Sequence, residues 1–142
     1  MDRSSQAPPV ARRWAQNLHL LLASLIALGI LSEGVLIGPS VFGDATWGRA
    51  LHGPLGAVLL LLTLLLPLIG LRARLPRRLT VLSAGLFVLT LIQAISGGSG
   101  SKVPVLAALH PANAMLICGL SVVLIFQGWQ LRRERRLELK AA

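Results

Sequence analysis

The sequence predicts an all-α integral membrane protein, built as an antiparallel up-down-up-down bundle of four transmembrane helices with both termini in the cytoplasm. The chain of 142 residues is 54% hydrophobic and 13% charged, with a mean hydropathy of +0.73. Soluble domains carry roughly twice that share of charged residues, about 25%. Four apolar runs come close to or exceed the roughly 20 residues that cross a bilayer core.

The four runs divide the chain into one membrane domain and two short tails. The expected spans are residues 18–37, 51–71, 79–95 and about 106–129, of which the third is the shortest. We therefore expect an N-terminal tail over 1–13, a four-helix domain over 14–130 and a basic C-terminal tail over 131–142. No remaining segment is long enough to form a soluble domain.

The positive charge lies almost entirely on one side of this arrangement. Of the 14 basic residues, only Arg49 and Lys102 fall in the first and third connections. The others lie in the N-terminal tail, between the second and third spans, or after the fourth, which the positive-inside rule assigns to the cytoplasm. We thus expect a protein of the cytoplasmic (inner) membrane whose arginines contact anionic lipid head groups. The net charge of +9 does not indicate nucleic-acid binding, because no fold remains to present these arginines to a groove.

Two histidines are the main candidates for a functional site. His52 and His110 each lie near the start of an apolar run, in Leu-His-Gly-Pro and Leu-His-Pro-Ala respectively. Short connections make the second and fourth helices diagonal neighbours that both enter from the outer side. The two imidazoles should then meet at one depth in the outer leaflet, the arrangement that axial ligation of a heme iron requires.

The prolines leave the local geometry of these histidines open. Because a residue before proline is disfavoured in helical angles, the fourth helix either kinks near His110 or begins at Pro111 with His110 as its cap. Pro54 can occupy the first turn of the second helix, where its missing N–H costs little.

Five further residues are candidates for the same site. Gly56 and Ala114, one turn after the two histidines, leave room for a flat macrocycle. Gln93 is placed to hydrogen-bond a ligand imidazole. For Arg49 two roles are open, neutralising Glu33 or holding a heme propionate, and Lys102 is a second cation for the latter role.

Bland readings of the same residues also exist. In one alternative, the histidines form hydrogen bonds that bridge helices, and the small residues serve only close helix packing. Quinone binding or proton relay through the pair is a further alternative. His19 lies near the cytoplasmic start of the first span, where we expect its side chain to snorkel toward the interface.

The four spans, with a histidine in the outer part of the second and of the fourth, resemble one half of a heme A synthase over about residues 14–130. That family has two such halves, each with a histidine pair, and the resemblance implies that His52 and His110 are axial ligands of one heme b. This chain has only one half, and Glu33 stands alone where the synthase has paired glutamates. Farnesyl hydroxylation is therefore not expected.

The sequence thus predicts a small membrane b-type cytochrome. We expect it to be an electron carrier between a quinol or membrane redox partner and an outer acceptor, or a subunit of a larger redox complex, rather than an enzyme by itself. The alternative is a non-redox assembly or structural subunit whose histidines only bridge helices.

Overall fold

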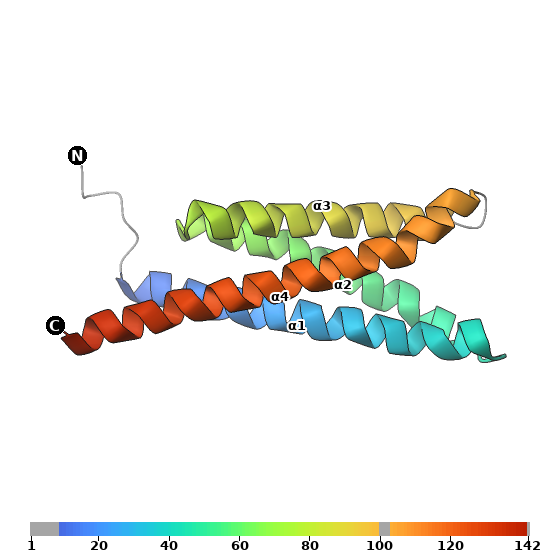
Figure 1. Ribbon diagram of the computed structural model, residues 1–142, viewed down its shortest axis with the longest axis horizontal. Helices are drawn as coiled ribbons and strands as arrows, with labels where there is room; N and C mark the ends of the chain where they lie inside the picture. Colours follow the sequence, from blue (N-terminus) through green and yellow to red (C-terminus); the bar gives the residue numbers. More distant parts are fainter. Residues whose placement is uncertain (1–8, 100–102, 142) are drawn as a thin grey trace.

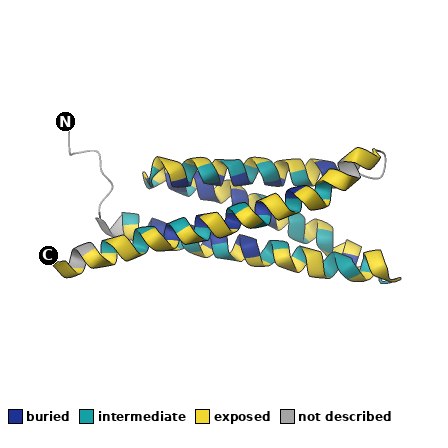
Figure 2. Ribbon diagram, viewed as in Figure 1, coloured by how far each residue is buried: buried dark blue, intermediate teal, exposed yellow. Residues whose placement is uncertain are grey.

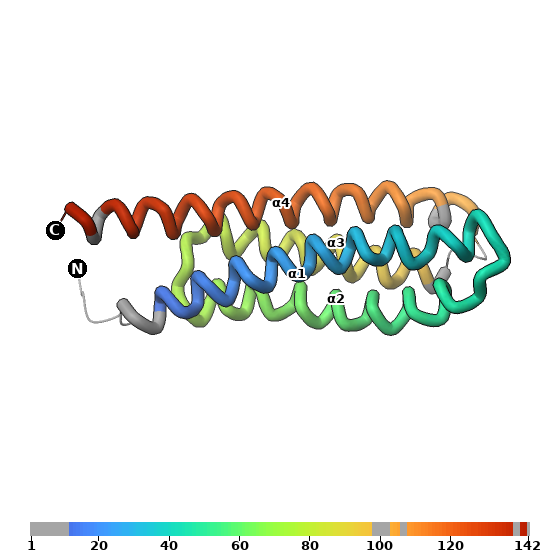
Figure 3. Tube along the Cα trace, turned by 90° about the horizontal axis from the view of Figure 1, so that it is seen from below, coloured from blue at the N-terminus to red at the C-terminus, as the bar shows by residue number. Residues whose placement is uncertain are grey.

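Four α-helices account for the secondary structure of the described residues, 9–99 and 103–141, in the computed structural model. No strand occurs in these ranges. Successive helices run in opposite directions along one axis (Figures 1 and 3). Their bounds are α1 Pro9–Phe42, α2 Trp47–Arg72, α3 Arg77–Ser99 and α4 Pro104–Ala141. The predicted all-α class and the number of helices are confirmed.

The helices close into a ring in which each packs against two neighbours. α1 contacts α2 and α4, and α3 contacts α2 and α4. In the described residues, the backbones of the diagonal pairs, α1 with α3 and α2 with α4, do not come into contact. All four helices are long and apolar enough to cross a membrane. We call the end that holds the start of α1, residues 73–76 and the end of α4 the basic end, and the opposite end the far end (Figure 3).

The helices are longer than the sequence predicted. α1 has 34 residues and α4 has 38, so the polar segment after residue 37 and the basic C-terminal tail are largely helical. The connection between α1 and α2 shrinks to residues 43–46, where Ser40 Oγ donates to the carbonyl of Ala45 and accepts the N–H of Arg49 at 3.2 Å. One hydroxyl thus satisfies backbone groups on both sides of the turn.

Both prolines near the histidines lie inside helices. Pro54 is within α2, which begins at Trp47, and Pro111 is within α4, which begins at Pro104. The expectation that Pro54 occupies a first turn and the alternative that His110 caps α4 were therefore wrong. Each histidine instead has at least one helical turn before it, which fixes the direction of its side chain.

The surface of the bundle is apolar and much of its interior is polar. Trp14, Phe42 and Met115 have exposed fractions of 67%, 92% and 77%. Thr63 and Ser121, by contrast, are fully buried, and Figure 2 shows buried residues on the faces turned toward the other helices. Helices in lipid gain little from hiding leucine, so they place small and hydrogen-bonding residues at their contacts.

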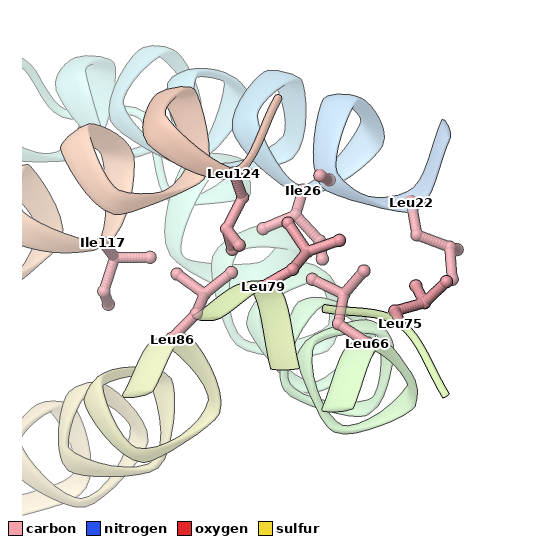
Figure 4. Close-up of a cluster of buried hydrophobic side chains, with 9 residues drawn as sticks. Leu22, Ile26, Leu66, Leu75, Leu79, Leu86, Ile117 and Leu124 are labelled. Carbon is pink, nitrogen blue, oxygen red and sulfur yellow. The ribbon is translucent and has the colours of Figure 1, made fainter. Parts of the chain in front are cut away.

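A cluster of buried aliphatic side chains packs together between the helices (Figure 4). We define the apolar layer as the four fully buried side chains, one from each helix, of Ile26, Leu66, Leu86 and Leu124. Along α1 this layer lies between His19 on the basic side and Glu33 on the far side. It therefore divides the polar interior into two separate regions.

Glycines allow α1 and α2 to approach closely. A Cβ at Gly48 would overlap the backbone carbonyl oxygen of Leu36, and one at Gly29 would overlap the side chain of Leu59. Backbone cannot move aside as a flexible side chain can, so Gly48 is the stricter requirement.

We predict that Gly48→Ala lowers the free energy of unfolding by about 1–3 kcal/mol, because the added methyl group pushes α1 and α2 apart. Reversible unfolding in mixed detergent micelles measures this difference. Gly119→Ala in α4 is the matched control, since a Cβ there meets nothing within 4 Å. It should be neutral or stabilise by about 0.5–1 kcal/mol through helix propensity. Equal effects of the two substitutions would contradict the close approach.

Candidate functional site

The structure brings the side chains of His52 and His110 together inside the bundle. Their ring centroids lie 6.1 Å apart with an angle of 64° between the ring planes. His52 comes from α2 and His110 from α4, the two helices of one diagonal. Both side chains are half-buried and lie on the far side of the apolar layer.

Glu33 of α1 holds one nitrogen of His52. Its Oε2 contacts Nδ1 of the imidazole, and the Glu33 side chain is only 12% exposed. A Cβ at Gly56 would lie 3.5 Å from Oε1 of Glu33, so this glycine borders the carboxylate. A carboxylate accepts hydrogen bonds only, so the neutral imidazole of His52 carries its proton on Nδ1 and its lone pair on Nε2.

A serine that the sequence analysis did not single out holds the corresponding nitrogen of His110. Oγ of Ser96, in α3, lies 3.2 Å from Nδ1 of His110 and 3.0 Å from the carbonyl oxygen of Gln93. The hydroxyl has a single proton, which it donates to that carbonyl, so it accepts from Nδ1–H of His110. The lone pair of His110 is therefore on Nε2, as in His52.

Small residues leave space for these groups. A Cβ at Gly97 would lie 2.9 Å from Cε1 of His110, closer than side chains tolerate, so only glycine lets the ring sit against α3. Ala114, one turn after His110, is half-buried on the same helix. The predicted role of Gly56 and Ala114 in making room for a macrocycle stays a prediction.

Gln93 takes part in a different contact from the one expected. Its Oε1 accepts a hydrogen bond of 2.8 Å from Nδ2 of Asn113, which also donates to the carbonyl of Leu89 at 2.9 Å. Ser96, and not the amide of Gln93, thus holds His110. Asn113 is 9% exposed and was missed by the sequence analysis. The feature of the sequence that could have indicated Asn113 is a single amide side chain, one turn after His110, in an apolar run.

Arg49, one of the cations proposed for the far end, is not paired with Glu33. Arg49 is exposed, and the partner of Glu33 is His52, so the alternative in which Arg49 neutralises this carboxylate was wrong. The position of Arg49 at the start of α2 leaves a role toward a propionate as a prediction. Lys102 lies outside the described residues.

His19 does not snorkel toward the interface. Its side chain is fully buried, and its Nε2 lies 2.8 Å from Oγ of Ser83 in α3. A short hydrogen bond to α3, the helix diagonally opposite α1, holds the imidazole inside, where the sequence alone indicated an interfacial residue.

The Nε2 atoms of His52 and His110, which make no hydrogen bond in the described residues, determine which ligand the two histidines could bind. Within residues 9–99 and 103–141, no hydrogen bond involves Nε2 of His52 or His110, and no group of three or more His, Cys, Asp or Glu side chains converges on a metal position. A bare ion would lack ligands here. A metal that a cofactor already holds with four ligands needs only two imidazoles from the protein, and His52 and His110 could supply them through Nε2. The centroid separation of 6.1 Å puts both imidazoles at one site.

Comparison with known proteins gives a family but no function. Residues 33–97 are similar to a family of unknown function, DUF6220. The matching segment begins at Glu33 and ends at Gly97, so it contains His52 and Ser96 but not His110. No curated protein and no solved structure matches the chain.

The amide pair beside the histidines should stabilise the contact between α3 and α4. In a double-mutant cycle of Asn113→Leu and Gln93→Leu, we predict a coupling energy of about 0.6–1.7 kcal/mol, the range for interhelical hydrogen bonds in membranes. Reversible unfolding in mixed micelles provides the four free energies. The control cycle pairs Asn113→Leu with Gln127→Leu, in the other half of α4, and should be additive. A coupling no larger than the control would show that the hydrogen bond does not stabilise the bundle.

Proposed function

We propose that His52 and His110 bind the iron of one heme b through their Nε2 atoms, and that the chain is a membrane b-type cytochrome that transfers electrons. The observation that carries this proposal is the pair of imidazoles 6.1 Å apart, each with its Nδ1 already held by a neighbouring helix. Ligating histidines characteristically donate their second N–H to a carboxylate or oxygen acceptor in this way. A heme, when bound, supplies a one-electron Fe(III)/Fe(II) couple.

The protein groups have separate tasks in this proposal. Glu33 orients His52 and increases the basicity of its Nε2, whereas the neutral hydroxyl of Ser96 orients His110 with less effect on basicity. Gly97 lets the His110 ring stand close to α3. Arg49, exposed at the far end of α2, is the candidate partner for a propionate.

The location of the pair follows from the charge distribution. With the basic end in the cytoplasm, the histidines lie toward the outer face of a bacterial inner membrane. Electrons would then come from a quinol or a membrane redox partner and pass to an acceptor on the outer side. The chain acts in this way by itself or as a subunit of a larger redox complex.

A second candidate function rests on the same contacts. The pair Glu33–His52 joins α1 to α2, and the pair Ser96–His110 joins α3 to α4. These bonds alone would make the histidines helix bridges in a non-redox assembly or structural subunit. Helix bridging does not require two imidazoles of different helix pairs to face each other, which is why we favour the heme.

Protein purified from heme-replete cells should show the reduced-minus-oxidised difference spectrum of a low-spin b-type cytochrome. His52→Ala and His110→Ala should each abolish the low-spin spectrum, because each removes one of two axial ligands. Thr63→Val, which removes a fully buried hydroxyl of α2 about three turns from His52, is the control for general effects on the bundle and should keep the spectrum.

The variants His52→Met and His110→Met separate loss of a ligand from loss of folding. A thioether is a competent axial ligand that raises the potential, so these proteins should retain heme with an altered spectrum. Wild-type protein that is folded but devoid of heme would refute the cytochrome and leave the helix-bridging function.

The carboxylate of Glu33 should set the potential of the bound heme. Glu33→Gln is expected to raise the midpoint potential by roughly 60 mV, the equivalent of a tenfold effect for a one-electron couple, because it weakens electron donation by His52. Spectroelectrochemical titration measures the shift. Glu134→Gln, at an exposed position near the end of α4, removes the same charge remotely and should leave the potential unchanged. An unaltered potential in Glu33→Gln would exclude this contact with a ligand histidine.

A further inference from the structure

Three polar side chains on one face of α1, at the basic end, each have a buried nitrogen without a hydrogen-bond partner. Arg12, Gln16 and His19 follow one another at spacings of four and three residues, which places them on one helix face. Gln16 is 4% exposed and His19 is fully buried. Among the described residues, Arg12 Nε, Gln16 Nε2 and His19 Nδ1 are all buried without a hydrogen-bond partner.

The hydrogen bonds of Ser83 define which proton His19 carries. Its Oγ lies 2.8 Å from Nε2 of His19 and 2.8 Å from the carbonyl oxygen of Leu79. The only hydroxyl proton is donated to that carbonyl, so Ser83 accepts from Nε2–H of the imidazole. The unpartnered Nδ1 therefore presents a lone pair. This is the opposite tautomer from that of His52 and His110.

The unpartnered atoms specify the chemistry of a guest. Nδ1 of His19 requires a donor, whereas the amide of Gln16 and Nε–H of Arg12 require an acceptor. A bare anion would be repelled by the imidazole lone pair, and a metal cation would be repelled by the N–H groups. A hydroxyl oxygen satisfies both sides, since it donates one hydrogen bond and accepts others.

We propose that Gln16 and His19 form a second polar binding site that holds one hydroxyl oxygen. That oxygen belongs to a water molecule or to the ring hydroxyl of a hydroquinone. Their burial keeps bulk water and lipid head groups away from these atoms, so such a guest is the means of satisfying the pair. Arg12 is half-buried and lies on the same face of α1, nearer the basic end than Gln16.

The apolar layer makes this site independent of the histidine pair. Ile26 and Leu66, both fully buried, stand between it and the far side of the bundle. The second site therefore does not depend on whether heme is bound at His52 and His110, and each proposal can fail without the other.

Nuclear magnetic resonance of the full chain, labelled with ¹⁵N in its imidazoles and held in detergent micelles under anaerobic reducing conditions, tests the proposal. The Nδ1 resonance of His19 should have the shift of a pyridine-type nitrogen that accepts a hydrogen bond. A water guest gives a through-space cross-peak between bound water and the His19 ring that added menadiol does not remove. A hydroquinone guest gives a saturable change of this resonance on titration with menadiol.

Gln16→Leu should weaken either guest about tenfold, as expected for the loss of one hydrogen bond. The effect is measured as the menadiol dissociation constant or the intensity of the water cross-peak. Gln127→Leu, the same substitution at a half-buried position of α4, should change neither. A free, non-bonded Nδ1 in the wild-type chain, with neither a water contact nor a menadiol response, would overturn the proposal even if the variants do not fold.

Discussion

The absence of hydrogen-bonding solvent along most of the bundle is the constraint on which the rest of the structure depends. A polar side chain in a membrane-spanning helix is costly unless it has a hydrogen-bond partner. Most of the buried hydroxyls find one by donating to a carbonyl one turn earlier, as Ser121 does to Ile117 and Thr90 to Leu86. Such local bonds need no other helix. The groups that reach across to another helix are therefore few, and they mark the places where the four helices are fixed relative to each other.

These cross-helix contacts lie mainly on the far side of the apolar layer. There Glu33 meets His52, Ser96 meets His110, and Asn113 meets Gln93. Each contact joins helices that are neighbours in the ring, whereas the two imidazoles face each other across its diagonal. The neighbour contacts thus hold the two rings beside each other, at a place that neither helix pair could define alone. This division of labour is what a site with two axial ligands requires.

Serine decides the chemical character of two of the three histidines. Ser96 and Ser83 both donate to a carbonyl of their own helix and therefore accept from an imidazole. Ser96 approaches Nδ1 of His110 and leaves Nε2 free, whereas Ser83 approaches Nε2 of His19 and leaves Nδ1 free. The ring of His110 lies beside that of His52, whereas His19 shares its helix face with Gln16. Identical residue types thereby serve a proposed metal site in one half and a proposed hydroxyl site in the other.

The sequence by itself determined the class of the protein, the number of helices and the residues worth examining, because membrane thickness and hydropathy act on the chain one segment at a time. It also placed His52 and His110 on alternate helices. Only the tertiary structure decided that Ser96 and not Gln93 holds His110, that Glu33 pairs with His52 and not Arg49, and that His19 is buried. These outcomes depend on how far each helix is rotated about its own axis. When a helix is apolar on nearly every face, its sequence does not indicate which face turns inward. The rotation is therefore determined only when the four helices pack together.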